Sequence, residues 1–144
     1  MSLFSAISIG ASGMAAQRAR AEILVENLAN AETTRTPEGG PYRRKDVVFA
    51  SATTVSPFAS VFNAQLESAG GVTVSDVVTD TSDPERRYLP GHPDADADGY
   101  VAFPRINPAE DMVDLVGASR SYQANVSAIA AVKDMIQHSL DLFR

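Results

Sequence analysis

The C-terminal part of the chain carries its longest uninterrupted helical pattern. Asn107 supplies an acceptor for an N-cap, Pro108 suits the first turn, and Glu110 completes a typical start signal. Apolar residues then recur at alternating steps of three and four, interrupted by two polar breaks. The series is Met112, Leu115, Ser119, Tyr122, Val126, Ile129, Lys133, Ile136 and Leu140. This spacing predicts a helix over residues 107–144 with a heptad seam along it.

A helix of this length needs cover along its whole seam. It would extend about 55 Å at ~1.5 Å per residue. Large side chains are scarce, since aromatic residues make up 7% and there is no Trp. Residues 1–31 offer a matching helix, with apolar residues at helical spacing and no proline. Gly10 and Gly13 are expected to fray it, because each glycine costs roughly 1 kcal/mol of helix stability. We expect the two ends to pair with each other, with copies of the chain, or with both.

The middle of the chain, residues 32–106, contains most of the proline and is expected to be small and irregular. Thr36–Pro41 is rich in Pro and Gly and predicts a loop. Three short apolar runs, at 47–49, 71–78 and 100–103, predict strands of one small sheet. Residues 50–70 are rich in Ser, Ala and Thr and are expected to be mobile. The predicted fold is mainly α with a small β middle, its N- and C-terminal helices paired as a coiled coil.

Charge and composition exclude several kinds of partner. The net charge is −6, whereas nucleic-acid binding needs concentrated Lys and Arg. Arg43, Arg44 and Lys45 form the only dense basic run, which is too short for such a site. No stretch reaches the ~20 apolar residues that cross a bilayer. The N-terminal segment lacks the basic residues that begin a cleaved signal peptide. We therefore expect no nucleic-acid partner, no direct membrane insertion and no cleaved signal.

One acidic loop has the beginning of a metal-binding pattern. Asp94–Gly99 places Asp at alternate positions before a glycine, as in the first half of a calcium loop. The twelfth position holds Arg105 instead of the required Glu, and no helical segment leads into the loop. His92 could add a nitrogen ligand, but metal sites generally need three or four convergent ligands. A calcium-binding module stays an alternative, and a solvated turn is the simpler interpretation.

Catalytic patterns are absent from the sequence. The chain has no Cys, no Gly-x-Ser-x-Gly elbow and no phosphate-binding glycine loop. The adjacent carboxylates Glu110 and Asp111 suit the positive end of a helix. We predict that the chain is not an enzyme and uses no cofactor or metal. A small hydrolase that works with carboxylates alone is the remaining enzymatic alternative.

Several segments match a known pattern. Asn27-Leu28-Ala29-Asn30 is similar to a box near the N-terminus of flagellar axial proteins, including rod, hook and hook-associated subunits. The stretches 31–45, 88–101, 107–115 and 119–126 resemble flagellar basal-body rod protein C in particular. Residues 50–70 match nothing in that family. Another axial protein, such as a different rod subunit, is the main alternative, because it would share the terminal helices and the box.

The resemblance implies a structural role. Such a protein polymerises with other rod proteins and copies of itself into the drive shaft for bacterial motility. Its terminal helices form an inner coiled-coil layer. It leaves the cytosol through the flagellar type III export apparatus, without a cleaved signal, and is located in the periplasmic rod of the basal body.

Contacts between subunits are expected at the helical seams, the Asn-Leu-Ala-Asn box and the basic run. The predicted interface residues are Leu24, Asn27, Leu28, Asn30, Arg43, Arg44, Met112, Leu115, Tyr122, Val126, Ile129 and Ile136. The seam residues follow from periodicity. The loop from Thr36 to Lys45 is assigned to a subunit contact on the resemblance alone, and its simpler interpretation is a solvated turn.

Overall fold

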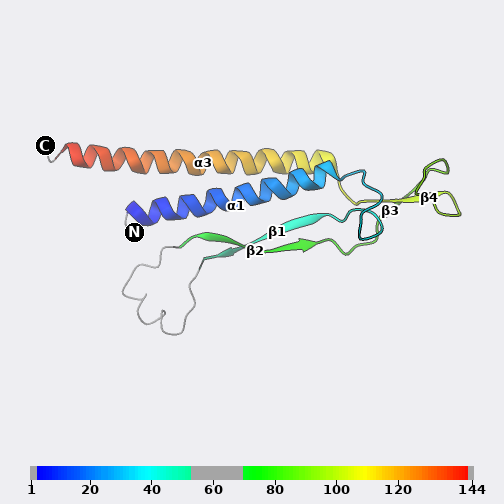
Figure 1. Ribbon diagram of the computed structural model, residues 1–144. Helices are drawn as coiled ribbons and strands as arrows, with labels where there is room; N and C mark the ends of the chain where they lie inside the picture. Colours follow the sequence, from blue (N-terminus) through cyan, green and yellow to red (C-terminus); the bar gives the residue numbers. More distant parts are fainter. Residues whose placement is uncertain (1–2, 53–69, 143–144) are drawn as a thin grey trace, which may run out of the picture.

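The computed structural model describes residues 3–52 and 70–142 as two long helices with two short β-hairpins between them (Figure 1). The elements in chain order are α1 Leu3–Ala29, β1 Lys45–Ser51, β2 Val72–Thr79, β3 Glu85–Tyr88, β4 Tyr100–Phe103 and α3 Pro108–Asp141. This arrangement confirms the predicted fold class of paired terminal helices around a small β middle.

Helix α1 is the central element of the fold. Figure 1 shows α3 running antiparallel along one side of α1 and the β1–β2 hairpin along another. The β3–β4 hairpin projects beyond the end of the helix pair where α3 begins. Apart from Leu3 at its first position, the well-exposed residues of α1 form one narrow stripe at steps of three and four, containing Phe4, Ser8, Ala11, Ala15, Arg18, Glu22, Val25 and Ala29. Most of the surface of α1 is therefore covered within the chain.

The strands differ from the predicted single sheet. β1 pairs with β2, and β3 pairs with β4, both antiparallel, as two separate two-stranded sheets. The three predicted strands are present, but β3 was missed because Glu-Arg-Arg-Tyr has no apolar alternation. The segment expected to be mobile starts at residue 50, yet Ala50 and Ser51 belong to β1. Residues 53–69 of that segment lie outside the described residues.

The start of α3 has the predicted cap. The Asn107 side-chain oxygen accepts a hydrogen bond from the Ala109 N–H at 3.2 Å, and Pro108 occupies the first turn. The cap satisfies one of the N–H groups that a helix start leaves without a partner. From there the helix continues without a break to Asp141.

The inner face of α3 differs from the predicted seam at every second seam position, where the residue that faces inward is the one just before the predicted residue. The residues that become buried or half-buried are Asp111, Asp114, Leu115, Ala118, Asn125, Ile129, Val132 and Ile136. Leu115, Ile129 and Ile136 were predicted correctly as seam positions. The other residues placed on the seam are exposed, namely Met112, Ser119, Tyr122, Val126, Lys133 and Leu140. The intervening inner positions are taken by Ala118, Asn125 and Val132.

Two glycines of α1 explain this difference. A Cβ added to Gly10 would lie 3.0 Å from Ile129 Cγ1, and one added to Gly13 would lie 3.0 Å from Asn125 Nδ2. The backbone of α1 therefore leaves room for these two side chains of α3, and α1 is continuous through both glycines. The expected fraying at Gly10 and Gly13 is wrong. Both glycines instead lie where the two helices approach closely.

Candidate subunit-interaction site

Asn27 connects the end of α1 to the start of β1. Its side chain is completely buried, with 0% exposure. The Asn27 Nδ2 donates to the Lys45 carbonyl oxygen at 2.8 Å, and its Oδ1 accepts from the Lys45 N–H at 3.0 Å. The amide thus bonds to both polar backbone groups of Lys45, as a peptide group of a third strand would. The Tyr42 hydroxyl donates a third hydrogen bond to Asn27 Oδ1 at 3.0 Å.

Asn30, the second asparagine of the box, closes the C-terminal end of α1. Its Nδ2 donates to the Glu26 carbonyl oxygen at 2.9 Å, and its Oδ1 accepts from the Thr33 hydroxyl at 3.1 Å. Carbonyls in the last turn of a helix otherwise lack intrahelical donors. The two asparagines therefore have different structural roles. Asn27 holds β1 against α1, and Asn30 caps the C-terminal end of α1, where the chain leaves the helix.

Tyr42 lies beside a charged pair at this junction. Lys45 Nζ is 2.6 Å from Glu26 Oε1 and 5.6 Å from the centre of the Tyr42 ring. Burial, with a smaller contribution from the Glu26 charge, raises the pKa of Tyr42 to about 12. The neutral phenol is favoured because the phenolate would be desolvated, would face Glu26 and could not donate to Asn27.

The raised pKa of Tyr42 predicts a loss of stability at alkaline pH. The folded pKa of about 12 exceeds the ordinary value of 10.0. The stabilisation is therefore complete below pH 10 and is lost as the pH rises towards 12. Urea unfolding followed by circular dichroism should show this decline in the wild type and a shallower one in Tyr42→Phe. Near neutral pH the variant should lose only about 1 kcal/mol, because Asn27 keeps both bonds to Lys45. Equal alkaline slopes in the two proteins would contradict the assignment.

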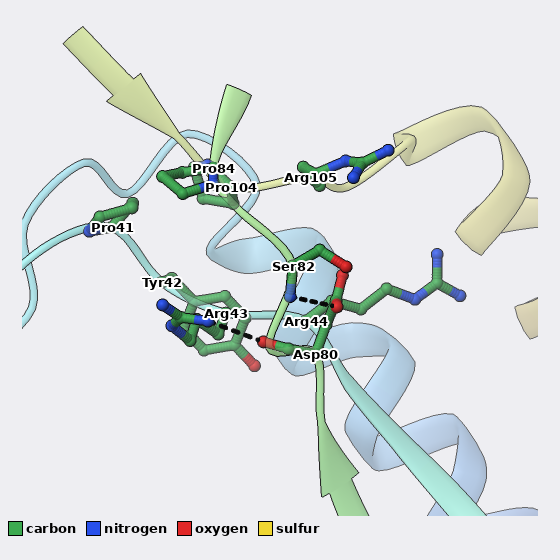
Figure 2. A pocket seen from close by; sticks show the side chains of 9 residues that line it. All are labelled: Pro41, Tyr42, Arg43, Arg44, Asp80, Ser82, Pro84, Pro104 and Arg105. Atoms are coloured by element: carbon green, nitrogen blue, oxygen red, sulfur yellow. Dashed lines mark hydrogen bonds between the residues drawn. The ribbon is translucent and has the colours of Figure 1, made fainter. Parts of the chain in front are cut away.

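Arg43 and Arg44 point to opposite sides of the chain (Figure 2). Arg43 is exposed and donates to the Asp80 carbonyl oxygen at 3.2 Å, next to a small pocket lined by prolines 41, 84 and 104. The Asp80 carboxylate accepts from the Ser82 N–H at 2.8 Å, and hydrogen bonding from Ser82 lowers the pKa of Asp80. Because Arg43 is exposed, its charge is accessible to solvent or to another chain.

Arg44 turns towards α3 instead. Its guanidinium Nη2 is 3.1 Å from Asp111 Oδ1, and its Nε is 3.4 Å from Asp46 Oδ2. Only 19% of the Arg44 side chain is exposed, whereas the Asp111 side chain is fully buried. Burial raises the pKa of Asp111, and the Arg44 charge opposes that shift. Arg44, predicted as an interface residue, thus makes an internal ion pair.

The remaining predicted interface residues divide into inner and outer sets. Leu24 is buried, and Leu28, Leu115, Ile129 and Ile136 are half-buried within the chain. Met112, Tyr122 and Val126 are exposed, at 53%, 41% and 45%. Together with the other exposed large apolar residues of α3 they make up what we call the outer α3 face, consisting of Met112, Val113, Val116, Tyr122, Val126, Met135 and Leu140. The part of each seam buried within the chain stabilises its own fold, and the role of all twelve in subunit contacts stays a prediction.

The acidic loop Asp94–Gly99 is held by contacts within the chain. The Thr34 hydroxyl donates to Asp94 Oδ2 at 2.8 Å, and Asp96 pairs with Arg86 and accepts from the Tyr100 N–H at 2.8 Å. Hydrogen bonding from this backbone N–H lowers the pKa of Asp96. Across residues 3–52 and 70–142, no three His, Asp or Glu side chains are grouped to hold a metal ion. These carboxylates therefore order the tip of the β3–β4 hairpin.

Two residues that matter here were not identified from the sequence as having these roles. Asp111 was interpreted as a helix-start acid, and only its burial beneath Arg44 distinguishes it from the exposed Glu110 beside it. Gly10 was interpreted as a weak point of a helix. The available signal was that Gly10 and Gly13 are three residues apart, the spacing of one helix face.

The fold and its surfaces define a class of protein before any comparison is made. Long terminal helices pack side by side, one of them leaves a row of large apolar side chains exposed, and the asparagine box serves packing. None of the helices in the described part of the chain is long and apolar enough to cross a membrane. These features define a structural subunit built on paired terminal helices.

Comparisons with known proteins identify the family. A family model described as flagellar basal body rod FlgEFG protein C-terminal matches residues 97–142. The chain is 41% identical to the flagellar basal-body rod protein FlgC of Bacillus subtilis, over 99% of each protein. It is 38% identical to FlgC of Borreliella burgdorferi, over 100% of this chain and 99% of the relative. Identity to FlgC of Salmonella typhimurium is 39%, over 99% and 98%. The chain therefore belongs to the FlgC family of flagellar basal-body rod proteins, a family of structural subunits that are not enzymes.

Proposed function

We propose that this chain polymerises with other rod proteins and with copies of itself, and that its outer α3 face makes the helix-to-helix contacts between subunits. The observation that carries the proposal is the exposure of Val126 and Met112, two residues two heptads apart, on a helix whose inner face is already packed on α1. Heptad-spaced apolar residues that α1 leaves uncovered need a second helix to bury them.

The energetic argument favours assembly through this face. Fully burying a Val or Met side chain contributes about 1.5–3 kcal/mol. The seven residues of the outer α3 face are 41–72% exposed in the single chain, so burying them contributes a free energy of the same order as the loss of freedom when subunits join. Contact between different faces of neighbouring chains, whose rotation does not close, gives an open helical filament such as a rod.

Different regions of the chain would then make different contacts in the rod. Segments 1–31 and 107–144 form the helical layer, and 32–106 supplies contacts to neighbouring rod proteins. Exposed Arg43 supports a contact role for the loop from Thr36 to Lys45. Family membership supports export through the flagellar type III apparatus and a periplasmic location. The net charge of −6 supports the absence of a nucleic-acid partner, and the lack of a membrane-spanning helix in the described residues supports the absence of membrane insertion.

Replacing Val126 with aspartate tests this proposal. The substitution places a charge on the outer α3 face, at a residue that is 45% exposed in the single chain, so the helicity of the purified chain should be unchanged. Cells carrying Val126→Asp should secrete the subunit normally but lose motility, because a charge without a partner in a buried helix contact is strongly unfavourable.

The matched control is Ser121→Asp. It introduces the same charge on the same helix at an exposed polar position, and its spacing of five residues from Val126 places it on a different side of the helix. These cells should swim in soft agar like the wild type. Normal swimming by Val126→Asp cells would show that the outer α3 face is not a subunit contact.

A further inference from the structure

Asp111 is an unusual residue in this fold. Its carboxylate is fully buried in the first turns of α3, and neither oxygen has a hydrogen-bond partner among the described residues. An ionised carboxylate in such a place is costly unless an opposite charge compensates it. The compensating group is Arg44, whose Nη2 lies 3.1 Å from Asp111 Oδ1.

The other charges around Asp111 oppose its ionisation. Asp46 on β1 and the neighbouring Asp114 and Glu110 on α3 all repel a negative charge at this position. Arg20 on α1 pairs with Asp114 instead, at 3.4 Å. Arg44 is thus the cation in direct contact with the buried carboxylate, and it comes from the loop that leads into β1.

We infer that Arg44 and Asp111 form a latch, in which the loop before β1 holds the first turns of α3 against the rest of the chain. When Arg44 is in place, the buried carboxylate is compensated and the start of α3 stays packed. When Arg44 is withdrawn, Asp111 must reach solvent or take up a proton, and the start of α3 loosens.

Arg44 has a second ionic partner, which it contacts at the same time as Asp111. Its Nε lies 3.4 Å from Asp46, whose side chain is well exposed. An arginine withdrawn from Asp111 therefore keeps an ionic partner at the surface, whereas Asp111 loses its own. Opening the contact therefore destabilises the start of α3, where Asp111 is left uncompensated, much more than it destabilises the loop that carries Arg44.

The use of this latch in assembly rests on the proposed function. Arg43 next to it is exposed, so a contact that another chain makes at Arg43 can shift Arg44 through the shared backbone. Such a contact would change how firmly α3 is held as the outer α3 face meets its neighbour. The latch itself is a property of the single chain and can be tested without a rod.

Amide hydrogen exchange of the purified full-length chain tests the latch, read by mass spectrometry on peptides covering residues 111–118. Arg44→Met keeps the apolar stem and removes the charge, and it should speed exchange in these peptides at least about tenfold. The matched control is Arg20→Met, which breaks an ion pair to Asp114 on the same helix, where both side chains are about 40% exposed. It should change exchange less than about twofold.

The double variant Arg44→Met with Asp111→Asn decides between a latch and ordinary packing. It removes the uncompensated charge, so exchange should return to within about threefold of the wild type, even if Arg44→Met alone unfolds the chain. Asp46→Asn removes the competing partner of Arg44 and should slow exchange or leave it unchanged.

Three results would overturn the latch. The first is a double variant that exchanges as fast as Arg44→Met, and the second is an effect of Arg44→Met no larger than that of Arg20→Met. The third is a wild type in which the amides of residues 111–118 exchange as fast as those of an unfolded peptide. None of them bears on the motility of Val126→Asp, so a failed latch and a failed rod contact are separate outcomes.

Discussion

Replacing Asn27 with leucine should lower the free energy of unfolding by about 3–6 kcal/mol, because three groups lose their hydrogen-bond partner inside the protein. Leucine has nearly the same shape as asparagine but leaves the N–H and C=O of Lys45 and the hydroxyl of Tyr42 unpaired. A loss of this size is a large fraction of the stability of a typical domain. Cells carrying the variant should not swim.

Urea unfolding by circular dichroism measures this effect, and two further variants show where it comes from. Asn27→Asp can still accept from Lys45 and Tyr42 but turns an oxygen towards the Lys45 carbonyl, so it should also be strongly destabilising. Asn30→Ala is the control within the same box. It loses bonds in a half-buried position and should cost only about 1 kcal/mol. Equal losses for Asn27→Leu and Asn30→Ala would refute the specific role of Asn27.

Replacing Gly10 with leucine should force the two long helices apart. Even a Cβ at this position comes within 3.0 Å of Ile129, so a full side chain cannot fit without moving α3. Overpacking of this kind costs about 1–3 kcal/mol, and it outweighs the roughly 1 kcal/mol that leaving glycine gains in a helix. The thermal midpoint should fall, and because the outer α3 face turns with the helix, motility should be lost.

Gly117→Leu is the matched control for Gly10→Leu. It makes the same exchange in α3 at a glycine that has nothing within 4 Å of the added Cβ. This variant should be as stable as the wild type or more stable, because only the helix-propensity gain applies. Combining Gly10→Leu with Ile129→Ala should recover part of the loss by making room for the leucine. If Gly10→Leu melts like Gly117→Leu, the close approach of the helices at Gly10 is wrong.

The terminal helices and their pairing could be predicted because their signals are local. The Asn107 cap, the absence of proline and the three-four spacing lie within a single stretch of chain. The phase of the α3 seam could not be predicted in the same way. Val126 and Asn125 are adjacent, and apolarity alone favours Val126 as the inner residue. Asn125 faces inward because Gly13 on the other helix provides the space, and that fact is not local.

The asparagine box shows a similar limit. The sequence identified Asn27-Leu28-Ala29-Asn30 as a family signal, without saying what the asparagines do. Their hydrogen-bond partners lie up to eighteen residues away, in Lys45, and depend on how the chain turns back. Asp111 became distinctive for the same reason, since its partner Arg44 is distant in sequence. Strand β3 was missed because its pairing with β4, and not its own composition, makes it a strand.

The two long helices differ in how substitutions on them act, because α1 has more of its surface covered within the chain than α3 has. A change in α1 disturbs its neighbours in the same molecule, so the damage appears as reduced abundance of the subunit. A change on the outside of α3 leaves the molecule intact, and its effect is felt by the surrounding subunits. Substitutions in α1 are therefore expected to lower the amount of the protein in the cell, whereas substitutions on the outside of α3 are expected to leave its amount normal and prevent its incorporation.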